Sequence, residues 1–382
     1  MSRGLPRGTI KLKPEDFVVD EIPAYEPSGE GSHLYVRIEK TNRTTDEVVK
    51  ELARALRVDR RDIGVAGLKD KVGVTRQWLS VPAADASFDD RVAALAIDGV
   101  AILERRRHGN KLKTGHLRGN RFAIVVRDID PARVDDVVSA LARIGEAGVP
   151  NAFGEQRFGR DGDTHERARA WLTGKERAPS DPRLRRFHFS ALQSAIFNAV
   201  LEHRVADGSW DVPILGDLLK KEESGGIFVC TDVQLDRERA RQGEVCPTGP
   251  IVGDRMRQPE ADAFDLEQRI SLPLIEGIDL RRARSLGEGT RRPLRLRVAE
   301  LSHSFLDSSL HEAASSQDPA DRHAVCAMTV RFVLPKGAYA TTVLSNAFEV
   351  SDAGRTGGPS EPAGHRPDER EERQLATLTE EE

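Results

Sequence analysis

The chain has 382 residues, 38% hydrophobic and 31% charged, which is the balance of a soluble globular protein long enough for two domains. It contains no apolar run near the roughly 20 residues that span a membrane, and its first residues lack the apolar core of a signal peptide. We therefore expect a cytoplasmic protein that does not bind a membrane. Three widely separated cysteines, Cys230, Cys246 and Cys326, predict neither a disulfide framework nor a metal site.

The net charge of −4 is unevenly distributed. Residues 351–382 carry a net charge of −5, and their Gly, Pro and Glu content predicts a disordered acidic tail. Two blocks elsewhere are basic: residues 105–121 hold seven Lys or Arg and no acid, and residues 281–297 hold seven Arg against Glu288 alone. Such blocks are typical of a solvated face or of a surface that binds nucleic-acid phosphates.

The first elements can be predicted from local patterns. Alternating apolar residues predict strands over 17–22 and 33–40, and the turn residues between them make us expect a hairpin. A helix is predicted over 44–58, because Thr44 and Glu47 form a capping box before apolar residues at helical spacing.

The stretch that carries the most chemistry lies between two β-like runs, 63–68 and 74–81, which predict strand, turn, strand with Asp70 at the turn. The positive charges of Lys69 and Lys71 favour the ionised carboxylate of Asp70, which can then act as nucleophile or base. In an arbitrary sequence the same trio is more often a solvated loop whose charges offset each other, so the wider pattern has to decide.

The remaining elements follow from glycine and proline positions and from apolar spacing. In chain order, we predict a basic loop (105–121), a strand (122–126), helices (130–144, 163–173 and 190–206), two loops (246–253 and 289–294) and a β-like run (329–334). We find no internal repeat.

The central pattern, Gly67-x-Lys69-Asp70-x-x-Gly73-x-Thr75-x-Gln77, resembles the signature of the TruD family of RNA pseudouridine synthases, which usually has Ala where Gly73 stands. Further motifs that resemble the family follow its order over most of residues 11–344. They are Lys11-x-x-Pro14-Glu15-Asp16-Phe17, Gly119-Asn120-x-Phe122, Val149-Pro150-Asn151 with Gln156-Arg157-Phe158-Gly159, Ser190 to Asn198, Thr248-Gly249-Pro250, Arg291-Arg292-Pro293 and Leu334-Pro335-x-Gly337.

The resemblance implies an α+β fold, in which a mixed and largely antiparallel sheet forms the catalytic domain and a second α+β domain, the TRUD domain, is inserted into it. We expect the catalytic domain at 1–148 and 304–350, the inserted TRUD domain at 149–303 and the disordered tail at 351–382.

The resemblance also implies an activity, the isomerisation of uridine to pseudouridine in tRNA, at position 13 in the family. Asp70 would be the nucleophile, and Lys11 and Lys69 would keep it ionised. The reaction needs no redox partner or energy input, so we expect no cofactor. We also expect no bound metal. The expected partner is tRNA, and the protein itself is expected to be a monomer. The expected substrate-binding residues are Glu15, Phe17, Gln77, Asn120 and Phe122, together with the basic residues Arg105, Arg106, Arg107, Lys111 and Lys113.

Several alternatives stay open at this point. Without the resemblance, Phe17 and Phe122 would be core residues and Asn120 a turn residue. Asp70 could attack the sugar, add to the pyrimidine or take a ribose proton. The chain could also be a catalytically silent RNA-binding protein that aids tRNA folding. A hydrolase that uses Asp70 would lack a partner acid, a metal site and a phosphate loop.

Overall fold

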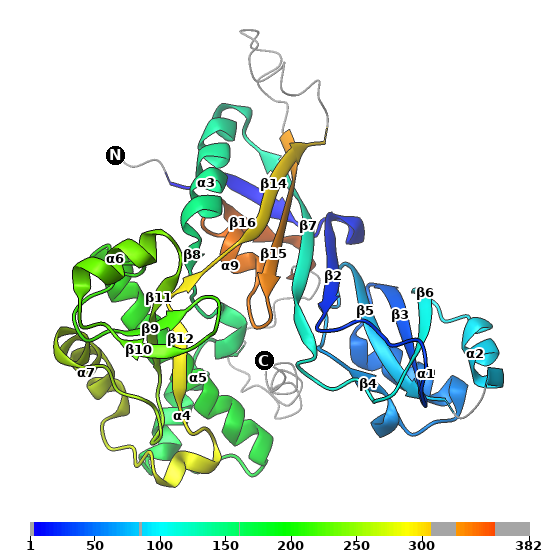
Figure 1. Ribbon diagram of the computed structural model, residues 1–382, viewed down its shortest axis with the longest axis horizontal. Helices are drawn as coiled ribbons and strands as arrows, with labels where there is room; N and C mark the ends of the chain where they lie inside the picture. The colour runs from blue at the N-terminus through cyan, green and yellow to red at the C-terminus, as the bar shows by residue number, and fades with distance from the viewer. Residues whose placement is uncertain (1–3, 84–85, 160, 307–325, 356–382) are drawn as a thin grey trace. The chain divides into compact units, whose positions relative to one another are not determined.

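The computed structural model describes residues 4–83, 86–159, 161–306 and 326–355 (Figure 1). These residues form two compact units: one contains residues up to 147 and from 298 onward, and the other is Gly148–Arg297. The insertion expected at 149–303 therefore differs at its end, because strand β14 (Ala299–Phe305) already pairs in the sheet of the first unit. Of the tail expected at 351–382, residues 356–382 lie outside the described residues, whereas Ser351 and Asp352 end a strand.

Within the described residues, the first unit contains a ten-stranded mixed sheet with the main order β14-β15-β7-β2-β5-β3-β6. Strand β1 joins β7 and β16, and β4 joins β5. The pairs β1/β16 and β2/β5 are parallel, and the other pairs are antiparallel. The strands other than β14 are β1 (Arg7–Ile10), β2 (Phe17–Pro23), β3 (His33–Thr41), β4 (Gly64–Val65), β5 (Val74–Pro82), β6 (Val100–His108), β7 (Leu117–Ile129), β15 (Cys326–Pro335) and β16 (Glu349–Asp352).

The hairpin expected from 17–22 and 33–40 is wrong, although both strands form. Strand β5 lies between them, with Thr75 opposite Val19 of β2 on one side and opposite Lys40 of β3 on the other. Alternation along a strand identifies its buried face but not its neighbour, because pairing partners are chosen by the packing of the whole sheet. As a result, the strand that follows Asp70 runs through the middle of the sheet.

The predicted helix after β3 is confirmed as α1 (Thr45–Leu56). Thr44 Oγ1 accepts from the backbone N–H of Glu47, and the Thr44 N–H donates to Glu47 Oε2, so the capping box is complete. The apolar face of α1 packs against β3 and β5, and burying each such side chain contributes about 1.5–3 kcal/mol. The other helices of this unit are α2 (Ala86–Ala93), α3 (Val134–Ala147) and α9 (Ala340–Leu344).

The loop expected over 105–121 is too long at both ends, because β6 continues to His108 and β7 begins at Leu117. A glycine does not always indicate a turn, because it can also be required where another backbone segment packs too closely for a Cβ atom. A Cβ on Gly119 would lie 2.1 Å from the carbonyl oxygen of Leu334 on β15, so this glycine serves close strand pairing.

The second unit contains an antiparallel sheet with the order β10-β9-β11-β12 and a short pair, β8 with β13. Its strands are β8 (Val149–Pro150), β9 (Leu218–Lys221), β10 (Ile227–Val229), β11 (Val245–Ile251), β12 (Thr290–Pro293) and β13 (Arg295–Leu296). Its helices are α4 (Thr164–Leu172), α5 (Pro182–Ala206), α6 (Val233–Arg241) and α7 (Ala261–Ile275), and Figure 1 shows the long α5 within this unit.

The loops predicted over 246–253 and 289–294 are wrong, since most of both segments forms the paired strands β11 and β12. Their glycine and proline content reflects packing. A Cβ on Gly249 would lie 2.9 Å from the ring of Phe197, so a side chain here would separate β11 from α5. The helices predicted over 163–173 and 190–206 are confirmed as α4 and α5, although α5 begins earlier, at Pro182.

Candidate active site

A row of side chains crosses the sheet of the first unit at its centre. Residues that lie opposite one another in neighbouring strands point to the same face. In this row Lys40 of β3, Thr75 of β5, Val19 of β2, Phe122 of β7 and Phe332 of β15 follow one another. The rings of Phe122 and Phe332 stack with centroids 5.3 Å apart. Phe17 meets Phe122 edge to face at 6.3 Å, so the row ends in an aromatic cluster.

Asp70 lies on the loop between β4 and β5, and its side chain is 54% exposed. The backbone of this loop is held by buried side chains. The ammonium of Lys40 donates to the carbonyl oxygen of Asp70 at 2.7 Å, and the side-chain amide of Gln77 donates to that of Gly67 at 3.2 Å. The loop is therefore fixed by its backbone while the carboxylate of Asp70 stays accessible.

Lys11 lies beside Asp70, as the resemblance implies. Its Nζ is 3.9 Å from Asp70 Oδ1 and 4.3 Å from the centre of the Phe17 ring, and its side chain is only 11% exposed. Its backbone has φ +58°, a left-handed conformation that is unfavourable for a lysine and is often found at functional sites. Lys11 thus places a positive charge beside the accessible carboxylate of Asp70.

A second carboxylate, which the sequence did not suggest, shares the ammonium of Lys11. Asp352 Oδ2 lies 3.4 Å from Lys11 Nζ, and the Asp352 side chain is 15% exposed. The parallel pairing of β1 with β16 sets Asp352 opposite Ile10, directly before Lys11. Asp352 belongs to no motif and lies in the segment predicted to be disordered, so no sequence signal could have identified it.

The ammonium of Lys69, which was expected to keep Asp70 ionised, lies against a different carboxylate. Its ammonium pairs with Glu21 Oε2 at 2.6 Å, and both side chains are almost fully buried. Lys69 anchors the loop to β2 instead.

Gln77 also acts on the loop, and each end of its buried side-chain amide makes a hydrogen bond. Its amide oxygen accepts a hydrogen bond from Thr45 Oγ1 at 2.9 Å, and its amide nitrogen donates to the carbonyl oxygen of Gly67. Thr45 Oγ1 in turn accepts from the backbone N–H of Lys69 at 3.1 Å. Thr45, which sequence reasoning missed, thereby joins the first turn of α1 to β5 and to the loop.

The other expected substrate residues differ in their surroundings. Phe17 and Phe122 are 3% and 4% exposed. Asn120 lies opposite Glu21, and its buried Oδ1 has no hydrogen-bond partner among the described residues. Glu15 is exposed on the short 3-10 turn Pro14–Asp16.

The neighbour of Glu15 is held firmly. Asp16 is buried and forms a bidentate pair with Arg127, with distances of 2.7 and 2.9 Å. In the motif Pro14-Glu15-Asp16, the second acid therefore secures the turn.

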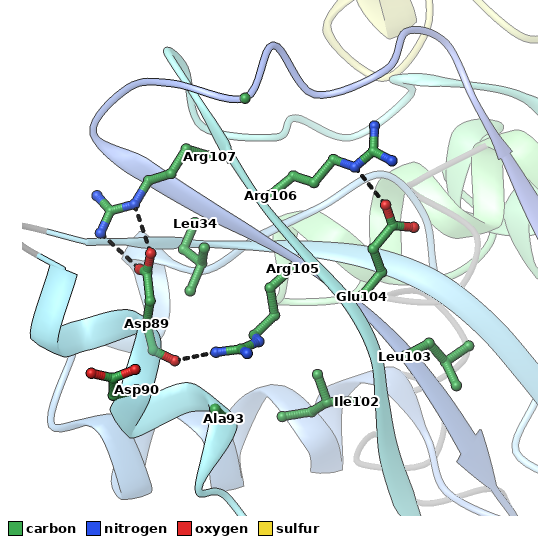
Figure 2. A pocket seen from close by; sticks show the side chains of 11 residues that line it. Leu34, Asp89, Asp90, Ala93, Ile102, Leu103, Glu104, Arg105, Arg106 and Arg107 are labelled. Carbon is green, nitrogen blue, oxygen red and sulfur yellow. Dashed lines mark hydrogen bonds and ion pairs between the residues drawn. The ribbon is translucent and has the colours of Figure 1, made fainter.

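Arg105, Arg106 and Arg107 lie on the edge strand β6 and line a hollow of about 690 Å³ (Figure 2). Arg107 pairs with Asp89 at 2.7 Å, Arg105 donates to the Asp89 carbonyl, and Arg106 pairs with Glu104 at 2.5 Å. Acidic partners thus offset part of the positive charge seen in the sequence.

The Arg107 end of this hollow is remote from Asp70. Arg107 lies opposite Leu34 of β3, whereas the Asp70 carbonyl binds Lys40 of the same strand. At about 3.3 Å per residue, these two positions are roughly 20 Å apart. Of the other basic residues, Lys111 donates to the carbonyl of Arg61, and Lys113 is exposed.

Part of the second basic block is structural. Arg291 is buried and pairs with Glu267 of α7 at 2.8 Å while donating to the Thr248 carbonyl at 2.7 Å. Burial raises the pKa of Glu267, and the guanidinium of Arg291 opposes that shift. Arg295 is also buried and donates to two carbonyls, whereas Arg281, Arg282 and Arg297 are exposed.

The family-like motifs of the second unit meet in its core. Asn151 donates to the Pro293 carbonyl at 2.8 Å. Asn198 of α5 accepts from the N–H of Phe153 and donates to its carbonyl, both at 2.9 Å. Arg292 lies over the Phe153 ring at 4.1 Å. These residues therefore join β8, β12 and α5.

Within the part of the chain that the structure describes, no group of three or more His, Cys, Asp or Glu residues is arranged to hold a metal ion. In that same part, no helix has the length and apolar character needed to cross a membrane.

The fold defines a class of protein. A solved structure from Methanosarcina mazei, described as a tRNA pseudouridine synthase D (TruD), matches with a TM-score of 0.73 at 23% sequence identity. The match covers 92% of this chain and 95% of that chain. The α+β class predicted for the chain is thereby confirmed as the pseudouridine synthase fold.

Sequence comparison identifies the family. The family model described as tRNA pseudouridine synthase D (TruD) matches residues 4–179 and 178–347. A tRNA pseudouridine synthase D of Anaeromyxobacter sp. (strain Fw109-5) is 45% identical over 345 residues, covering 88% of this chain and 91% of the relative. One from Thermus thermophilus is 38% identical over 344 residues, covering 90% and 89%. The chain belongs to the tRNA pseudouridine synthase D (TruD) family.

Proposed function

We propose that this protein is a tRNA pseudouridine synthase that converts a uridine of tRNA, at position 13, to pseudouridine with Asp70 as its nucleophile. The observation that carries the proposal is the accessible carboxylate of Asp70, 3.9 Å from the ammonium of Lys11 on a loop whose backbone is held in place. An ionised carboxylate on a fixed backbone is what nucleophilic catalysis requires.

The chemistry fits a site of this composition. The reaction breaks the bond between ribose C1′ and uracil N1, turns the base and forms a bond from C1′ to C5, from which a proton leaves while N1 takes one up. Substrate and product have the same atoms, so neither a redox partner nor an energy source is needed. Asp70 could attack the sugar, add to the pyrimidine or take a ribose proton, and each route begins with the ionised carboxylate.

The surroundings suit a uracil that has left its stack. Extruding a base costs a few kcal/mol, which aromatic and polar contacts offset. Phe17 lies against Lys11 and belongs to the aromatic cluster with Phe122 and Phe332. The buried Oδ1 of Asn120 is an acceptor that a uracil N–H could satisfy, and leaving such an atom unpaired is unfavourable.

The tRNA backbone would meet exposed cations. Arg106 is 51% exposed, and Lys113, Arg281, Arg282 and Arg297 are also exposed. Contacts of this kind position an RNA without reading its sequence and weaken with salt. We propose that the protein acts on tRNA as a monomer in the cytoplasm, without a cofactor or a protein partner.

The proposal is tested with tRNA tritiated at uridine C5, because only rejoining through C5 releases that hydrogen to water. We expect release by the native chain without added metal and none by Asp70→Asn, which should bind tRNA with an unchanged Kd. Release by Asp70→Asn at the native rate would exclude Asp70. Tight binding without release by the native chain would favour an RNA-binding protein without catalysis, and free uracil would indicate a hydrolase.

A further inference from the structure

Lys40 is a buried cation close to the proposed nucleophile, and none of the family-like motifs includes it. Its side chain has no exposed surface. The ammonium donates to the carbonyl oxygens of Arg43 at 2.6 Å and Asp70 at 2.7 Å, with that of Lys69 further away at 3.5 Å. Burying a charge is strongly unfavourable unless hydrogen bonds compensate for the lost contact with water. The hydrogen bonds to these carbonyls offset the cost of burying the Lys40 ammonium.

The position of Lys40 connects three parts of the first unit. It lies near the end of β3, opposite Thr75, in the row that leads across the sheet to Phe122. Arg43 precedes the N-cap of α1, and Asp70 is on the loop between β4 and β5. One side chain thus ties the central strands and the start of α1 to the backbone of Asp70 itself.

We propose that Lys40 is a positioning residue, whose ammonium holds the Asp70 backbone so that the carboxylate meets the reacting nucleoside in one orientation. This inference rests on the proposed role of Asp70. A neutral apolar side chain of the same length would fill the space but could not bind the two carbonyls. A misplacement of about 1 Å can lower a catalytic rate roughly 100-fold.

The charge of Lys40 makes this role measurable by pH. Burial lowers its pKa to about 8, the carboxylates of Asp70 and Glu47 oppose that shift, and the ammonium of Lys69 adds to it. The amine is therefore charged at pH 7 and becomes neutral as the pH rises through about 8. A neutral amine still donates hydrogen bonds, but charge-assisted bonds are roughly twice as strong.

The experiment compares tritium release from pH 6.5 to 9.5 by the native chain, Lys40→Met and Lys50→Met, a lysine on the exposed face of α1 that pairs with Asp46. For the native chain and for Lys50→Met we expect kcat to fall as the pH rises through about 8, with KM unchanged. For Lys40→Met we expect kcat about 100-fold lower at pH 7, an unchanged Kd for tRNA and no fall near pH 8.

Each outcome decides the inference. A Lys40→Met variant with native kcat and native pH profile would overturn it, and so would a native kcat that stays constant to pH 9.5 while Lys40 loses its charge over the same range. The native profile needs no variant, so the test holds even if Lys40→Met fails to fold. Asp70→Asn is assayed in parallel: activity there contradicts the proposed function, whereas an inactive Asp70→Asn beside a constant native profile contradicts only the role of Lys40.

Discussion

Lys11 places one positive charge between two carboxylates, and the two are not equivalent. Asp70 is more than half exposed, while Asp352 is largely buried and closer to the ammonium. Asp352 Oδ1 also accepts from the Gly354 N–H at 3.0 Å, so this carboxylate is itself held. Asp352 is therefore the carboxylate that holds Lys11 in place, whereas the carboxylate of Asp70 stays accessible to a substrate.

Asp352→Asn should lower kcat while leaving the tRNA Kd unchanged. The amide still accepts from Gly354 but attracts Lys11 less, so the ammonium is less well fixed beside Asp70. We expect a loss of about 10-fold, measured by tritium release under saturating tRNA. Glu349→Gln, an exposed change on the same strand, is the control and should keep native kcat. A native rate for Asp352→Asn would remove Asp352 from the site.

Gly73 departs from the family pattern for a reason visible in its backbone. Its φ of +137° favours glycine, and a Cβ there would lie 2.5 Å from the carbonyl oxygen of Phe17. Gly73→Ala, which restores the usual family residue, should therefore shift the loop and Phe17 apart.

We expect Gly73→Ala to lower the free energy of unfolding by about 1–3 kcal/mol and to reduce kcat. Urea unfolding and tritium release measure the two effects. Gly109→Ala is the matched control, because a Cβ at Gly109 meets no atom within 4 Å. Equal stability of the two variants would show that the loop adapts to the alanine.

At the scale of elements, α1 is the support of the Asp70 loop as well as a cover for the sheet. Thr45, in its first turn, binds Gln77 of β5 and the N–H of Lys69 at once. The helix is amphipathic by sequence, and its cap and apolar face could be predicted because those signals lie within a dozen residues. Its polar link to the loop could not, because the partners come from two other segments.

Thr45→Val should test this link with almost no change in shape. The valine leaves the Gln77 oxygen and the Lys69 N–H buried without their partner, which costs about 1–3 kcal/mol of unfolding free energy. We expect kcat to fall as well, since the loop loses one of its anchors. Thr329→Val on β15 serves as the control, and an equal loss of kcat in that variant would argue against the link.

The difference between local signals and contacts from distant segments explains which predictions were confirmed. The strand after Asp70 and the helices α1, α4 and α5 follow from local spacing and caps, whereas the strand predicted over 63–68 is only the two-residue β4. The partner of β2 was wrong because β5 comes between β2 and β3 from further along the chain. The charges of Lys69 and Arg291 pointed to function in the sequence, yet Glu21 and Glu267 bind them in the interior. Charge can be read from sequence, but its partners depend on the tertiary fold.

At the scale of the whole molecule, Lys40 should make stability and activity respond to pH in opposite directions. Its pKa is about 8 when folded, against 10.5 for an unperturbed lysine. Between these values the unfolded chain binds more protons, so the free energy of unfolding rises with pH. Below pH 8 both states are charged, and the full cost of burying the charge applies.

Relative to Lys40→Met, the native chain should therefore gain about 2 kcal/mol of unfolding free energy between pH 8 and 9.5, while its kcat falls. Urea unfolding of both proteins at the two pH values measures the gain, and taking the difference removes the groups that they share. A difference that stays constant with pH would mean that Lys40 keeps its charge in the folded protein.

The pairing of β1 with β16 has a consequence for how the enzyme is made. Lys11 and Asp70 leave the ribosome early, but Asp352 is added only after the second unit and the strands β14 and β15 have been synthesised. The ammonium of Lys11 therefore lacks its fixed partner until β16 has been made. Full activity would require β16 docked beside β1, so the order of translation delays it until the first unit is assembled.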